Sequence, residues 1–168
     1  MKEALVRVII EAMKPRFIVD VNVGRLARRL RMLGYDTLFI NGVDDDELIR
    51  IALKEKRILL TRDTGIMQRR VVTIEKAKTV FIESDDVKDQ LRQVVEKLEL
   101  ETDFDPFSIC MECNEPLVDR EKTEVRDLVP PYVFKTQEQY MQCPSCKRVY
   151  WRGTHWEKMA EELDDLKG

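Results

Sequence analysis

The chain has 168 residues, 43% of them apolar and 36% charged, and a formal net charge of −3 at pH 7. This length suits one compact domain with a small module attached, and a negative net charge excludes a protein that binds nucleic acid simply as a polycation, so any such contact must use a local basic patch. No apolar segment approaches the roughly 18 residues of a membrane span, and we therefore expect a cytoplasmic protein without a membrane-spanning helix.

The first hundred residues alternate between short apolar runs and segments with helical periodicity. After an apolar stretch at 1–14, which we expect to pack on the body of the protein, we predict strands at 16–20, 36–40, 57–63 and 79–83. We predict helices at 22–33, 44–56 and about 87–98. This alternation indicates a three-layer α/β sandwich with a parallel sheet of about four strands.

Acids lie at the carboxyl ends of these strands or just beyond them: Asp20, Asp63, Asp85, Asp86, and either Asp45 or Asp46 at the start of the second helix. Ligands of parallel sheets bind at this edge, and clusters of oxygen ligands suit Mg²⁺ or Mn²⁺. Taken alone, each acid is more typical of a helix N-cap or an exposed loop, and we prefer that interpretation for Asp46 and Asp86. Three acids that each close a strand nevertheless favour one metal site.

The four cysteines form two Cys-x-x-Cys pairs, Cys110 with Cys113 and Cys143 with Cys146. Each pair supplies two thiolates from one tight turn, which is half of the sulfur tetrahedron around a structural Zn²⁺. Two disulfides would need a secreted protein, and a redox Cys-x-x-Cys needs only one pair, so we favour zinc. Four sulfurs leave no open position, and we expect a structural zinc ribbon at 103–168 after an α/β domain at 1–102.

Several segments are distinctive in combination. They are Phe17-Ile18-Val19-Asp20-Val21-Asn22 with the following 24–37, Asp45-Asp46-Glu47-Leu48, Arg57-Ile58-Leu59-Leu60-Thr61-Arg62-Asp63, both cysteine pairs, and Val149-Tyr150-Trp151-Arg152-Gly153-Thr154-His155-Trp156. In this order, over about residues 16–159, the chain resembles the Mut-seven C-terminal RNase family, in which a PIN-like domain is fused to a zinc ribbon. The resemblance implies a PIN-like ribonuclease with structural zinc and catalytic Mg²⁺ or Mn²⁺.

The resemblance also implies roles for individual residues. Asp20 and Asp63 become the first and third acids, and the second falls in the acidic segment at 44–47, where we choose Asp45. Asp85 is the candidate fourth ligand, and Asn22 is expected to orient Asp20 or a bound water. Two metal ions would clamp the attacking and leaving oxygens while an activated water hydrolyses the RNA phosphodiester.

An RNA substrate with single-stranded character needs cations for its phosphates and surfaces for its bases. The candidate cations are Arg25, Arg28, Arg29, Arg62, Lys147 and Arg148, although a solvated helix face explains the helical arginines equally well. Trp151 and Trp156 are expected either to stack on unpaired bases or to pack between the domains. We favour packing for Trp156, because 156–166 has the pattern of an amphipathic terminal helix, and we assign His155 no chemical role.

Two other functions stay open at this point. One is a ribosomal-RNA-maturing PIN endonuclease that carries a zinc ribbon, against which the segment Gly24-Arg25-Leu26-Ala27-Arg28 argues. The other is a non-catalytic RNA-binding or adaptor module, which would keep the cations but would not need the carboxylates.

Overall fold

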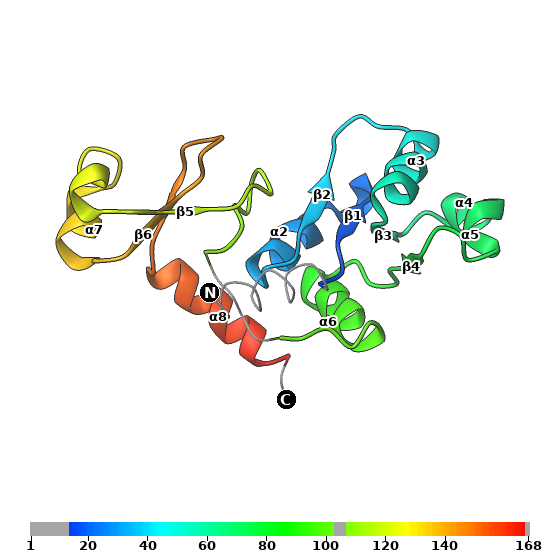
Figure 1. Ribbon diagram of the computed structural model, residues 1–168. Coiled ribbons are helices and arrows are strands. Elements are labelled where there is room, and N and C mark those ends of the chain that lie inside the picture. The colour runs from blue at the N-terminus through cyan, green and yellow to red at the C-terminus, as the bar shows by residue number, and fades with distance from the viewer. Residues whose placement is uncertain (1–13, 103–106, 167–168) are drawn as a thin grey trace, which may run out of the picture.

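The computed structural model describes residues 14–102 and 107–166 (Figure 1). The segment expected to pack on the body before residue 14, and the side chain of His155, lie outside this description.

Four parallel strands form the centre of the larger part of the molecule. They are β1 (Phe17–Val19), β2 (Thr37–Phe39), β3 (Ile58–Thr61) and β4 (Thr79–Phe81), in the order β2-β1-β3-β4. In the register of the sheet, Phe17 pairs with Thr37 on one side and with Ile58 on the other. Every residue of β1 and β3 is buried, as expected for inner strands of a parallel sheet that is covered on both faces. The four predicted strands are confirmed.

Helices cover both faces of this sheet. Phe17 and Val19 of β1 pack with α2 (Gly24–Met32) and α6 (Val87–Lys97), whereas Ile18 faces the other way, toward α3 (Asp45–Glu55). A short 3-10 helix, η1 (Val21–Val23), precedes α2. The three layers are therefore those that the alternating pattern predicts, because successive side chains of a strand point to opposite faces.

Two short helices between β3 and β4 were not predicted. α4 (Thr64–Met67) and α5 (Arg70–Thr73) lie between β3 and β4 and bury Ile66 and Val72 on the face covered by α3. Each has only four residues, which is too short to show a helical period in the sequence.

The cysteine-containing part has a three-stranded antiparallel sheet and a small core. Its strands are β5 (Val118–Arg120), β6 (Tyr140–Gln142) and β7 (Val149–Tyr150), and the 3-10 helix η2 (Lys122–Val125) and α7 (Pro131–Thr136) lie between β5 and β6. The buried cluster here consists of Val125, Val129 and Tyr140. With so little apolar core, this part depends on a further cross-link for its stability.

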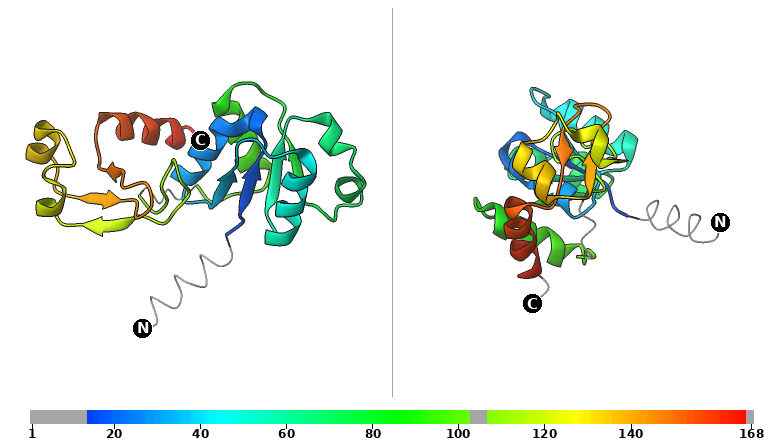
Figure 2. Two further views of the ribbon diagram at one scale, coloured as in Figure 1. Left: turned by 90° about the horizontal axis from the view of Figure 1, so that it is seen from above. Right: turned by 90° about the vertical axis from the view of Figure 1, so that its left-hand side faces the viewer.

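The last helix, α8 (Thr154–Asp164), returns from the ribbon to the α/β part (Figures 1 and 2). Met159 and Leu163 join the core formed by α2 and α6, and Glu162 pairs with Arg29 at 2.7 Å. The predicted terminal amphipathic helix is confirmed, with its start two residues earlier than expected.

A buried arginine attaches the first cysteine turn to the α/β part. Arg31 is 5% exposed, and its guanidinium donates to the carbonyl oxygens of Thr37 at 2.9 Å and Met111 at 2.8 Å. Burial lowers the pKa of Arg31, although nearby acidic groups act in the opposite direction. Asn114 completes the contact, because its Oδ1 accepts the N–H of Thr37 at 2.8 Å on the edge strand β2. The ribbon thus covers a strand edge that would otherwise be open.

Candidate functional site

The four cysteine sulfurs lie within 4.8 Å of one another and could hold one metal ion. Cys110 Sγ and Cys146 Sγ are 3.8 Å apart, and none of the four cysteines is in a disulfide. A tetrahedron with Zn–S bonds of about 2.3 Å has edges of about 3.8 Å, so the observed spacing fits zinc. The alternative of two disulfides is excluded in this conformation.

Both cysteine turns have the same backbone design. The N–H of Cys113 points to Cys110 Sγ at 3.5 Å, and the N–H of Cys146 points to Cys143 Sγ at 3.4 Å. The residue after each pair has a left-handed backbone, with φ of 66° at Asn114 and 64° at Lys147. Such turns aim backbone N–H groups at the sulfurs and so favour the thiolate form that binds metal.

The crowding of the sulfurs affects their ionisation. A hydrogen bond with Cys146 raises the pKa of Cys113 to about 12, whereas the backbone N–H of Arg148 lowers the pKa of Cys146 to about 7. Four thiolates this close together repel one another unless a cation neutralises them. The donor set, its spacing and its electrostatics therefore all suit a divalent cation.

At the carboxyl edge of the parallel sheet, Asp20 directly follows β1. Its Oδ1 accepts the N–H of Val21 at 2.6 Å, and its Oδ2 accepts the hydroxyl of Thr61 at 2.9 Å. Asn22 Nδ2 also points to Oδ2, at 3.5 Å, in the direction expected for a residue that orients Asp20. Asp20 is only 7% exposed, which is unusual for a carboxylate that forms no ion pair with the residues the structure describes.

Thr61 connects Asp20 to Asp63. Thr61 ends β3 and is fully buried, and the Oγ1 that donates to Asp20 also accepts the N–H of Asp63 at 2.9 Å. Asp63 caps α4, because its Oδ1 accepts the N–H of Gly65 at 2.6 Å. The Thr61 hydroxyl therefore binds the carboxylate of Asp20 and the backbone N–H of Asp63. The sequence places the hydroxyl of Thr61 two residues before Asp63, but no role was predicted for Thr61.

Replacing Thr61 by Val is expected to lower the free energy of unfolding by about 2 kcal/mol, because a buried hydrogen bond to a carboxylate is lost at nearly constant volume. Thr61→Ser keeps the hydroxyl and should lose about half as much or less. Urea unfolding of the three proteins checks this. A Thr61→Val protein as stable as the wild type would show that the hydroxyl does not hold the acids.

Asp45 is the first residue of α3 and lies in the electrostatic field of the two strand-end acids. Partial burial raises the pKa of Asp45, the charges of Asp63 and Asp20 raise it further, and Arg69 lowers it. The other acids of this segment have different partners: Asp44 caps α3 through the N–H of Glu47, Asp46 pairs with Arg69 at 3.0 Å, and Glu47 pairs with Arg50 at 2.6 Å. Of this segment, Asp45 is therefore the acid whose pKa reflects the charges of both strand-end acids.

The acids after β4 are placed differently. Asp86 caps α6 by accepting the N–H of Lys88 at 2.9 Å, the role expected for it. The side chain of Asp85 is 90% exposed and forms an ion pair with Arg62, which also approaches the carbonyl of Glu83 at 3.4 Å. Asp85 thus has a cation as its partner, and a role as fourth metal ligand would require this pair to open.

Across residues 14–102 and 107–166, the four cysteines are the only group of three or more potential ligands within 4.8 Å of one another. The carboxylate oxygens of Asp20, Asp45 and Asp63 therefore do not all lie within 4.8 Å of one another. The charges of Asp63 and Asp20 still act on Asp45, because together with its burial they raise its pKa.

The candidate phosphate-binding cations are mostly engaged with protein groups. Arg28 and Arg148 both pair with Glu112 Oε1, at 3.0 and 3.3 Å, and Lys147 donates to the carbonyl of Pro144 at 2.6 Å. Arg25 is exposed and has no ion pair in the described part of the chain. Arg69, which pairs with Asp46 at 3.0 Å, is a further cation near the acids.

Trp156 lies in the first turn of α8, and Trp151 precedes this helix by three residues. Trp156 stacks on Phe107 with ring centroids 5.9 Å apart and an interplanar angle of 14°, and the Arg152 guanidinium lies over its ring at 5.2 Å. Trp156 thus packs within the protein, as expected. Trp151 is partly buried against the small core of the ribbon.

None of the helices in the described residues combines the length and the apolar character that crossing a bilayer demands.

Comparison with known protein families identifies a relationship over most of the chain. A family described as "Mut7-C RNAse domain" matches residues 15–163, which is most of the chain and includes all the acids and cysteines discussed above. Searches of curated proteins and of solved structures found no match.

Proposed function

Because the chain belongs to the Mut7-C RNAse domain family, we propose that it is a metal-dependent ribonuclease that hydrolyses phosphodiester bonds in RNA with unpaired nucleotides. The observation that carries this proposal is the linkage of Asp20 and Asp63 through Thr61, with Asp45 in the field of both. An oxygen-only set of ligands at the carboxyl edge of a parallel sheet suits Mg²⁺ or Mn²⁺.

The chain's own residues would prepare this reaction by position and charge. Asp20 is held at both oxygens, by Val21 N–H and by Thr61, so its carboxylate has a fixed orientation. Asp63 is held at Oδ1, which leaves Oδ2 to face a ligand. Mg²⁺ or Mn²⁺ bound between these acids would supply Lewis acidity to the phosphate and to a hydrolytic water.

Two arginines near the acids are candidates for binding the substrate. Arg62 pairs with Asp85 and Arg69 with Asp46, and the acid of each pair is largely exposed, at 90% and 79%. Exposed ion pairs contribute little to stability, so phosphates could replace the acids at low cost. In this proposal Arg62 and Arg69 contact the RNA backbone beside the site of cleavage.

The cysteine cluster has a structural role in this proposal. Four sulfurs form a closed tetrahedral shell, so a zinc ion there has no position for substrate or water. The cluster also organises the backbone carbonyl of Met111, to which Arg31 donates. Zinc would thus hold the ribbon on the α/β part, while the carboxylates bind the catalytic ion.

Cleavage assays on the purified zinc-loaded protein test the proposal. Single-stranded RNA and DNA of one sequence are incubated with Mn²⁺, with Mg²⁺ and without either, beside Asp20→Asn and the matched control Asp86→Asn. We expect RNA cleavage that needs the divalent ion, is lost in Asp20→Asn and persists in Asp86→Asn.

Two results would contradict this expectation. Cleavage that survives in Asp20→Asn would point to another site or to a contaminating nuclease. RNA binding without cleavage under every condition would identify the non-catalytic module instead.

A further inference from the structure

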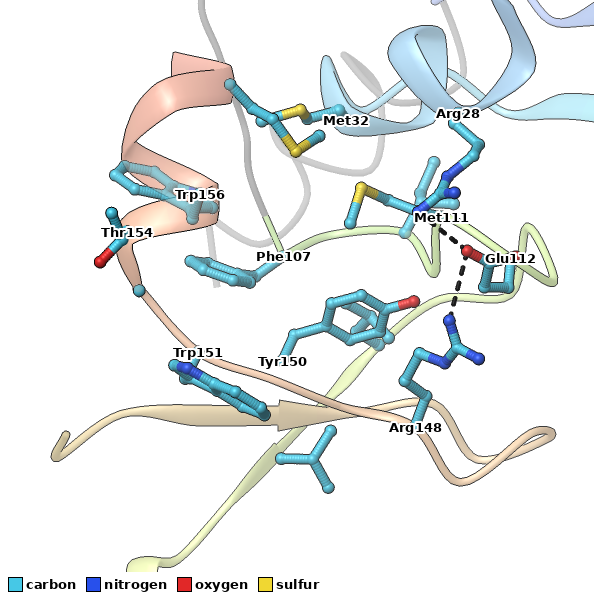
Figure 3. A pocket seen from close by; sticks show the side chains of 15 residues that line it. Arg28, Met32, Phe107, Met111, Glu112, Arg148, Tyr150, Trp151, Thr154 and Trp156 are labelled. Atoms are coloured by element: carbon cyan, nitrogen blue, oxygen red, sulfur yellow. Dashed lines mark ion pairs between the residues drawn. The ribbon is translucent and has the colours of Figure 1, made fainter. Parts of the chain in front are cut away.

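A cavity of about 290 Å³ lies where α2, the first cysteine turn, β7 and α8 meet (Figure 3). Its walls come from three segments far apart in the sequence: α2, residues 107–117 and residues 148–159. The volume is near the lower end of the range for small-molecule sites, which suits one small flat group. The acids at the carboxyl edge of the sheet do not line this cavity.

Aromatic and thioether side chains form nearly half of the cavity wall, and most of the rest is aliphatic or charged. Figure 3 shows Phe107, Tyr150, Trp151 and Trp156 around it, together with Met111. Trp151 and Trp156 are the only tryptophans in the chain. Flat apolar walls of this kind favour a planar ligand that stacks on them, and nucleobases are such ligands.

One end of the cavity carries two arginines that converge on one carboxylate. Arg28 and Arg148 approach Glu112 Oε1 at 3.0 and 3.3 Å, and their side chains are 51% and 56% exposed (Figure 3). Two cations and one anion leave this end with an excess positive charge. Each guanidinium has five N–H donors, so both retain donors for an anionic group while paired with Glu112. A ligand that complements the whole cavity is therefore planar at one end and anionic at the other.

We infer that this cavity binds one unpaired nucleotide of an RNA strand, with its base among the aromatic side chains and its phosphate at Arg28 and Arg148. The inference rests on the proposed function, because it takes RNA as the ligand. It assigns the ribbon a part in substrate binding that is separate from its attachment through Arg31.

The helix α2 provides a path from this cavity to the acids. It follows η1, which Asp20 caps, and it ends at Met32, in the cavity wall, over a length of roughly 12 Å at 1.5 Å per residue. Arg25, which is exposed, and Arg28 follow one another along the helix. An RNA strand with one nucleotide in the cavity could therefore reach the acids at the carboxyl edge of the sheet within roughly two to four nucleotides.

Tryptophan fluorescence tests this inference directly, because both tryptophans line the cavity. The intact zinc-loaded protein is titrated, in buffer without Mg²⁺ or Mn²⁺, with a short oligouridine and with a fully abasic ribose-phosphate oligomer of the same length. We expect oligouridine to quench the fluorescence. We expect the abasic oligomer to bind about tenfold more weakly or worse, since it keeps the phosphates but cannot stack.

Variants locate the effect within the ribbon. Arg148→Ala should weaken oligouridine binding by about tenfold, whereas Arg126→Ala, an exposed arginine near Phe134 at the far end of the ribbon, should change it by no more than about twofold. Equal binding of the two oligomers, unchanged fluorescence on binding, or equal effects of the two substitutions would overturn the inference.

The Asp20→Asn variant separates this inference from the proposed function. Because Asp20 does not line the cavity, Asp20→Asn should bind oligouridine with the same quenching as the wild type. If the wild-type protein shows quenching but no cleavage with Mg²⁺ or Mn²⁺, the proposed activity is refuted and the cavity assignment stands. Cleavage that depends on Asp20, without quenching, would refute the cavity assignment alone.

Discussion

Replacing Asp45 by Asn is expected to slow metal-dependent RNA cleavage by about 10³-fold, and to leave the free energy of unfolding of the metal-free protein unchanged or slightly higher. The loss of activity follows because a ligand that stabilises charge in the transition state contributes several kcal/mol. Stability should not fall, because burial and the charges of Asp63 and Asp20 raise the pKa of Asp45 and so oppose its ionised form. A neutral amide removes that repulsion.

The segment itself supplies matched controls for this substitution. Asp44→Asn keeps an N-cap acceptor for the N–H of Glu47, and Asp46→Asn removes only the exposed pair with Arg69. Cleavage rates with Mn²⁺ and urea unfolding without divalent ions are measured for all three variants. If Asp44→Asn or Asp46→Asn abolished cleavage and Asp45→Asn did not, the second acid would be wrongly assigned.

The second large effect is expected from Cys143→Ser. The wild type should contain one zinc ion per chain, and the variant should lose most of it together with the fold of the ribbon. Structural Zn²⁺ contributes roughly 10–16 kcal/mol to small zinc modules, far more than the ribbon core of Val125, Val129 and Tyr140 can replace. Loss of the first cysteine turn would also remove the carbonyl partner of Arg31 at Met111.

Elemental analysis and limited proteolysis check this prediction. We expect protease cleavage within 107–150 in the variant, with the α/β part surviving longer. Ser145→Ala is the matched control, because Ser145 is exposed within the same turn and contributes its backbone, not its side chain, to Cys143. A Cys143→Ser protein that retains one tightly bound zinc and resists protease would contradict the four-sulfur site.

Local patterns in the sequence were sufficient for most of the fold. Alternating apolar runs and helical periods gave the four strands and the helices α2, α3, α6 and α8, because each of these elements is long or apolar enough to show its period. The two Cys-x-x-Cys pairs likewise identified the sulfur cluster, since each pair is a local turn. The helices α4 and α5 were missed because four residues contain about one turn.

The partners of charged side chains were harder to predict. Sequence reasoning grouped Asp85 with the strand-end acids, but in the structure Asp85 pairs with Arg62. It named Arg28 and Arg148 as candidate phosphate contacts but did not predict that both pair with Glu112. Such pairings depend on side chains from segments that meet only after folding, and no local pattern encodes them.

The sequence by itself determined the strands and longer helices of the α/β part, the positions of the acids at the ends of parallel strands and the sulfur cluster, because these follow from short-range periodicity and from the direction of the strands. Only the tertiary structure decided that Thr61 links Asp20 to Asp63, that Arg31 and Asn114 attach the ribbon to β2, and that an aromatic cavity forms beside α2. Each of these features joins residues that are distant in the chain, so it depends on how the layers pack.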